Sequence, residues 1–181
     1  MNIRKLCLEM GVSNAADIPK HKLVLQSQMR FYCEKNHCGM YGRSYACPPH
    51  IGEINALMAH LSSFSQVVFF QNIYSLEDSF DYEGMTAAKN KHKQMTLQIS
   101  RAVYKKYGKH QALVLSAGAC DKCNTCALFT HEPCRHPDDA LAPLEAYGIN
   151  VSQVCNDSLK YINGENTVTY FSAVFVKNPF K

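Results

Sequence analysis

The 181-residue chain contains no tryptophan and no long apolar run. A transmembrane helix needs about 18 or more consecutive apolar residues, and no such stretch occurs. The first residues, MNIRKLCLEMGVSNAADIPKHK, place polar side chains where the apolar core of a secretory signal would need an unbroken run. These absences predict a cytoplasmic protein that neither spans a membrane nor is exported.

The usual signatures of cofactor enzymes and hydrolases are missing as well. The chain has no P-loop, no G-x-G-x-x-G after a predicted strand, no G-x-S-x-G, no H-E-x-x-H and no C-x3-C-x2-C of radical-SAM enzymes. The formal net charge of +4 comes without a dense lysine and arginine block interleaved with aromatic residues, so a nucleic-acid partner is not indicated. No common enzyme class is therefore predicted, and whether the protein is an enzyme stays open.

Cysteine, in contrast, is abundant. The chain has nine cysteines, an odd number, and in the expected reducing compartment disulfides rarely persist. Seven of them fall into two short segments, with Cys33, Cys38 and Cys47 in the first and Cys120, Cys123, Cys126 and Cys134 in the second. Core cysteines do not gather in this way, so we predict that all seven bind metal.

The second group reads C-D-K-C-N-T-C-A-L-F-T-H-E-P-C, with three cysteines at successive two-residue spacings and a fourth after seven further residues. This spacing resembles the bacterial ferredoxin run, in which a tight turn directs thiolates to neighbouring irons of a [4Fe–4S] cubane. In two-cluster ferredoxins the fourth cysteine of such a run binds the other cluster, so the partition of ligands stays open. Zinc, the alternative, favours cysteine pairs set well apart.

The first group has three local cysteines, with Gly39 and Gly42 permitting a tight backbone path. Cys47 precedes two prolines and a predicted helix, whose positive N-terminal end favours thiolates or an anionic cluster. A fourth ligand is either a remote side chain or absent, which would leave one iron open to substrate. The candidate side chains are Cys155, Cys7, His37 and His50. A Cys3His zinc site, with His37 or His50, is the alternative.

Apolar periodicity and turn signals predict the secondary structure. The expected order is a broken helical segment over residues 1–30 with a joint at Pro19, a cysteine loop over 31–50, a helix containing Ile54, Leu57, Met58 and Leu61, a strand Gln66–Tyr74, a helix Met85–Tyr107 ended by Gly108, a strand Ala112–Gly118, a cysteine loop over 118–137, a helix Asp138–Tyr147, a short strand from Ile149 and a strand Thr167–Val176. This order predicts one metal-binding domain over 1–181, an α+β or α/β sandwich with helices packed on a small mixed sheet.

The long predicted helix carries six basic residues, and cations inside the cysteine loops could offset the charge of a cluster. The basic face of the helix would suit an acidic redox partner, or it is simply solvated. His92 falls on the apolar face and is predicted to be a core histidine rather than a ligand. The basic helix residues are Lys89, Lys91, Lys93, Arg101, Lys105 and Lys106, and the loop residues considered for tuning or ligation are Arg43, Arg135, His131 and His136.

Three segments also resemble one known family. They are CEKNHCGMYGRSYACPPHIG, CDKCNTCALFTHEPCRHPDDALAPLEAYGINV and NGENTVTYFSAVFV. The family consists of cysteine-rich, predicted metal-binding proteins of unknown function, frequent in anaerobic bacteria and archaea. The resemblance matches both motifs at every cysteine, leaves Cys7 and Cys155 outside them, and departs at Tyr45, where the family pattern has tryptophan. It implies metal binding but no particular reaction.

Together these observations predict an iron–sulfur protein that carries one or two [4Fe–4S] clusters. Its expected role is electron transfer or reductive assistance to another enzyme. One alternative is an enzyme with an open iron at the site of Cys33, Cys38 and Cys47. The other is a zinc-stapled binding module, in which the metal only holds the loops.

Overall fold

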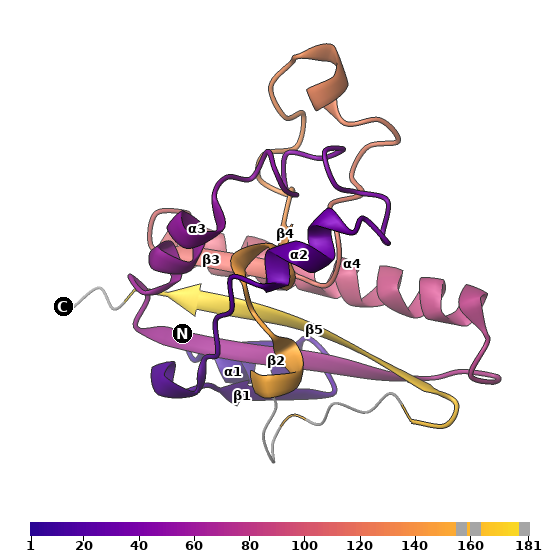
Figure 1. Cartoon of the computed structure of the whole chain (residues 1–181). Helices are drawn as coiled ribbons and strands as arrows, with labels where there is room; N and C mark the ends of the chain where they lie inside the picture. The colour runs from indigo at the N-terminus through magenta and orange to yellow at the C-terminus, as the bar shows by residue number, and fades with distance from the viewer. Residues whose placement is uncertain (155–158, 160–163, 178–181) are drawn as a thin grey trace.

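A computed structural model describes residues 1–154, 159 and 164–177 (Figure 1). The strands are β1 (Asn14–Asp17), β2 (Gln66–Ser75), β3 (Ala112–Ser116), β4 (Ala142–Pro143) and β5 (Thr167–Val176). The α-helices are α1 (Ile3–Glu9), α2 (Met29–Glu34), α3 (Ile54–Leu61), α4 (Tyr82–Tyr107) and α5 (Val151–Val154), and the 3-10 helices are η1 (Lys20–Lys22), η2 (Ala127–Thr130) and η3 (Leu144–Tyr147). Within these described ranges, no helix has the length and apolar character needed to cross a membrane.

The five strands form one mixed sheet in the order β1-β2-β5-β3-β4. β5, the last strand in the sequence, lies in the centre and pairs antiparallel with both β2 and β3. β1 pairs antiparallel with β2, and the short β4 pairs parallel with β3. The cysteine loop after β3 therefore begins beside the sheet centre.

Apolar side chains of the central strands alternate between two buried clusters, one on each face of the sheet. In β2, Phe69 belongs to the cluster that includes Leu61 of α3 and Leu144 of η3. The next residue, Phe70, belongs to the cluster that includes Ile99 of α4. Because both faces are covered, β2 and β5 read as nearly continuous apolar runs rather than as alternating ones.

A buried polar network interrupts the cluster under α4. His92 is fully buried, its Nδ1 lies 2.8 Å from Asn72 Oδ1 and its Nε2 lies 2.8 Å from Ser172 Oγ. Thr96 Oγ1 lies 3.0 Å from the same serine oxygen and donates to the His92 carbonyl. Burial lowers the pKa of His92 to about 4, so the ring is neutral near pH 7. His92 is thus a satisfied core histidine, as the sequence predicted.

The strongly periodic elements follow the prediction, and the short ones depart from it. β2, α4, β3 and β5 lie where they were expected, and α4 ends at Gly108, which has a φ of 74°. The predicted helix Asp138–Tyr147 is wrong, because this stretch contains β4 and then a single 3-10 turn. The expected strand at Ile149 is a single bridge to Leu25. β1 was missed, since its four residues, NAAD, lack the β-branched and aromatic types that mark strands.

Replacing the residue that caps the N-terminus of α4 is expected to destabilise the protein. The Asp81 side chain accepts a hydrogen bond of 2.7 Å from the Gly84 amide. Loss of such a cap exposes an unpaired helix amide, so Asp81→Ala should lower the free energy of unfolding by about 1 kcal/mol. Urea denaturation measures this change. Gln98→Ala, an exposed change in the middle of α4, is the control and should stay within about 0.5 kcal/mol.

Candidate metal centre

The two cysteine-rich segments, far apart in sequence, lie side by side beyond the β4 edge of the sheet (Figure 1). We refer to residues 31–50 as the first cysteine loop and to residues 118–137 as the second cysteine loop. The Tyr45 hydroxyl of the first loop donates a hydrogen bond of 2.9 Å to the Glu132 carbonyl of the second. One pocket is lined by residues of both loops. The fold thus brings the two predicted metal sites into one region.

Left-handed turns and local hydrogen bonds shape the first loop. α2 ends shortly before Asn36, which has a φ of 55° and accepts a hydrogen bond of 2.9 Å on its side chain from the Tyr41 amide. Gly42, with a φ of 71°, donates its amide to the Pro48 carbonyl at 2.8 Å. A side chain would strain the backbone at this φ, which explains the glycine. These turns bring the chain back, so that Cys47 lies near the cysteines that precede it.

Electrostatic interactions among the thiols of the first loop show their proximity. Burial, with smaller contributions from the negative charges of Cys38 and Cys33, raises the pKa of Cys47 to about 12. The backbone amide of Cys120 hydrogen-bonds the Cys47 thiol and acts in the opposite direction. Burial also raises the pKa of Cys33. Thiols of this kind are protonated at neutral pH, and a metal binds them by displacing their protons.

The second loop is held mainly by polar contacts to α4 and by its own arginine. Lys93 of α4 has a side chain only 14% exposed; it donates to the Ala119 carbonyl at 2.6 Å and forms an ion pair with Asp121. Arg135 donates to the Thr125 carbonyl at 3.2 Å and to Glu132 at 3.1 Å. Between residues 118 and 137 the one buried residue is Ala127. Apolar packing therefore contributes little to the order of this loop.

Cationic side chains accompany the sulfurs in both loops. The charge of Arg30 favours the thiolate of Cys33, and the charge of Lys93 favours that of Cys120, although burial is the larger influence and raises both pKa values. Arg135 hydrogen-bonds the Cys123 thiol. The buried Nε of Arg30 has no hydrogen-bond partner within the described part of the chain. A donor of this kind suits sulfur ligands, because hydrogen bonds to sulfur tune a bound cluster.

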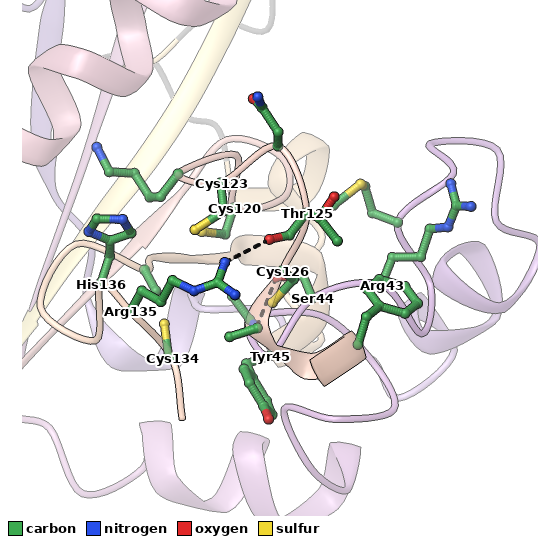
Figure 2. A pocket seen from close by; sticks show the side chains of 17 residues that line it. Arg43, Ser44, Tyr45, Cys120, Cys123, Thr125, Cys126, Cys134, Arg135 and His136 are labelled. Carbon is green, nitrogen blue, oxygen red and sulfur yellow. Dashed lines mark hydrogen bonds between the residues drawn. The ribbon is translucent and has the colours of Figure 1, made fainter. Parts of the chain in front are cut away.

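The pocket between the loops has a volume of about 360 Å³. Cys120, Cys123, Cys126 and Cys134 line it from the second loop (Figure 2). Arg43, Ser44 and Tyr45 line it from the first loop, and Arg135 and His136 complete its polar wall. The region therefore combines soft thiolate donors, which suit iron–sulfur clusters or zinc, with positive charge that would offset an anionic group.

The other residues considered from the sequence lie in different places. Cys7 is fully buried among apolar residues beneath α4, on the opposite face of the sheet from Cys120, and so is not a ligand. His37 and His50 are exposed on the first loop, and Cys155 lies outside the described residues. Across the ranges that the structure describes, no three His, Cys, Asp or Glu side chains are close enough to hold one metal ion. The cysteines are thus gathered in one region without forming a closed mononuclear site.

Three residues near the sulfurs escaped the sequence reasoning. Arg30 precedes Cys33 by one helical turn, a spacing that could have revealed it. Lys93 belongs to the basic helix face that the sequence suggests is either a docking surface or simply solvated, yet its side chain holds the second loop. The charge of Glu145, a residue whose own pKa is raised by burial, raises the pKa of Cys33. No local sequence signal connects Lys93 or Glu145 to the cysteines, because the contacts are tertiary.

Comparison with known proteins identifies the family. Comparison with curated proteins and with solved structures gave no match. The family model described as "predicted metal-binding protein (DUF2284)" matches residues 16–176, a range that includes both cysteine loops and all five strands except the first two residues of β1. The match agrees with the resemblance seen in the sequence. The chain therefore belongs to the DUF2284 family of predicted metal-binding proteins.

Proposed function

We propose that this protein carries one or two [4Fe–4S] clusters on its two cysteine loops and serves in electron transfer or as a reductive accessory to another enzyme. The observation that carries the proposal is that the fold brings together seven cysteines from two segments far apart in the sequence. The two-residue spacings of Cys120, Cys123 and Cys126 favour a cubane over zinc. When bound, such clusters would supply one-electron chemistry.

The charges around the loops support an anionic group at this site. Arg30, Lys93 and Arg135 each interact with a different cysteine. Several thiolates in one region repel one another, and neighbouring cations offset that repulsion. The potential of a cluster depends on its net charge, hydrogen bonds and exposure, so these three cations would also tune it.

An acidic redox protein is the partner that the remaining charges favour. Lys93 is paired with Asp121 of the second loop, and Arg101 is paired with Asp139, just after that loop. Neither side chain is therefore free for docking. Lys91, Lys105 and Lys106 remain exposed along α4. Charges of this kind steer an acidic carrier and make the association sensitive to salt.

An enzyme with an open iron is the second candidate. The pocket between the loops favours an open iron beside the cysteines of the second loop, because Cys33, Cys38 and Cys47 do not line it. A volume of about 360 Å³ lined by Arg43 and Arg135 has room and charge for a small anionic substrate. A zinc-stapled binding module has no comparable observation in its favour, although it shares the same thiolate ligands.

The decisive measurement is iron, acid-labile sulfide and zinc per chain in protein purified without oxygen. We expect about four or about eight irons with matching sulfide, for one or two cubanes. Oxygen must be excluded, because vacated thiolates take up zinc, which binds more tightly than ferrous iron. Stoichiometric zinc without sulfide would overturn the proposal. Cys7→Ala, remote from the loops, is the control and should leave the metal content unchanged.

A further inference from the structure

The first cysteine loop has three cysteines, and the structure brings a fourth cysteine to it from the other loop. The backbone amide of Cys120 hydrogen-bonds the Cys47 thiol. Cys120 also packs against the apolar cluster that contains Ala46, the residue before Cys47. Cys120 and Cys47 thus approach each other although 72 residues separate them in the sequence.

The other candidates for this position are placed less well. Cys7 is buried on the opposite face of the sheet. His37 and His50 are exposed, and the His50 ring lies against Tyr45, with ring centroids 6.3 Å apart. Cys120, in contrast, is half-buried and lies beside Cys47 on the same face of the sheet.

We propose that Cys120 is the fourth ligand of the site formed by Cys33, Cys38 and Cys47, and that Cys123, Cys126 and Cys134 form a separate three-cysteine site. That the bound group is an iron–sulfur cluster rests on the proposed function, whereas the partition of the cysteines does not.

Cys120 lies at the boundary between the two groups. The charge of Cys134 also raises the pKa of Cys120, after burial, and Cys120 lines the pocket with the other three cysteines of its loop. Two observations favour assigning Cys120 to the first site. Its backbone amide hydrogen-bonds the Cys47 thiol, and Cys120 stands at the start of the second loop, where the chain is still packed on the core. In two-cluster ferredoxins, too, one cysteine of a run binds the other cluster, although there it is the fourth cysteine rather than the first.

This partition moves the incomplete site from the first loop to the second. From the sequence alone, an open iron among Cys33, Cys38 and Cys47 was one of two alternatives, the other being a remote fourth ligand. With Cys120 assigned there, the site short of one thiolate is the one that borders the pocket of Arg43 and Arg135. An anionic ligand is the best candidate to complete this second site, because the positive charges of the two arginines would attract it.

The test uses a background variant in which Cys123, Cys126 and Cys134 are all replaced by alanine. Purified without oxygen, this variant should retain about four irons and four sulfides per chain. Adding Cys120→Ala should then weaken iron binding more than about 10-fold against a competing chelator, since even changes behind the ligands cost that much. Adding Cys7→Ala instead is the matched control, and it should leave iron binding unchanged. Electron paramagnetic resonance of the reduced proteins reports the same cluster independently, and circular dichroism checks the fold.

Two outcomes would overturn the partition. Iron binding that is unchanged by Cys120→Ala would show that another group completes the first site. A background variant that folds but holds no metal would show that both loops share one centre. If the wild-type protein holds zinc without sulfide, the proposed function fails, and zinc counts on the same variants still test the role of Cys120.

Discussion

Removing the metal is expected to open both cysteine loops to protease while the sheet stays folded. The second loop buries one residue, Ala127, and its backbone hydrogen bonds are local turns such as the one from the Phe129 amide to the Cys126 carbonyl. Segments with so few buried contacts open at little cost in free energy. A metal that crosslinks the loops stabilises the closed form, because the open form lacks the assembled ligands.

Limited trypsin digestion measures this opening directly. Exposed sites lie at Lys35 and Arg43 in the first loop and at Lys122 and Arg135 in the second. With metal at about 100 times its dissociation constant, cleavage at these sites should be about 100-fold slower than in the metal-free protein. Cleavage at Lys105 and Lys106 in α4 is the internal control and should not change. Equal loop cleavage with and without metal would mean that the metal does not order the loops.

Acid is expected to destabilise the protein through His92. The pKa of this buried ring is about 4 in the folded state, against 6.5 for an ordinary histidine. A depressed folded-state pKa means that the unfolded chain takes up a proton first as the pH falls. The stabilising contribution of the neutral ring is therefore complete above pH 6.5 and is lost between pH 6.5 and about 4. Over that interval the loss amounts to about 3 kcal/mol.

Urea unfolding of wild type and His92→Gln at pH 7 and pH 4.5 tests this contribution. The variant should be less stable at pH 7, because the hydrogen bonds to Asn72 and Ser172 are disturbed, but it should lose less stability on acidification. The difference between the two proteins removes the acid effects that they share, including loss of metal. His110→Gln, at an exposed position, should keep the wild-type pH dependence. The same dependence in His92→Gln as in wild type would rule out this role for His92.

The match between sequence and structure depends on how strongly each segment is patterned. β2 and β5 are runs of β-branched and aromatic residues, and α4 repeats its apolar positions over 26 residues. These strands and this helix therefore follow from local sequence preferences. β1 and β4 are short and exist because β2 and β3 offer edges to pair with. The stretch after Asp138 has helical spacing but is pinned by β4 and by the positive φ of Gly148, so it forms a single 3-10 turn.

The sequence by itself identified this chain as a predicted metal-binding protein, since the cysteine spacing and the family resemblance needed no tertiary information. Only the tertiary structure decided that these loops meet, because β5 enters the sheet between β2 and β3 and sets the end of β3 beside the first loop. The same packing placed Lys93 on the second loop and Cys7 on the opposite face. Ligand residues are a local property of the chain, whereas the pairing of ligands from distant segments depends on contacts that local spacing does not encode.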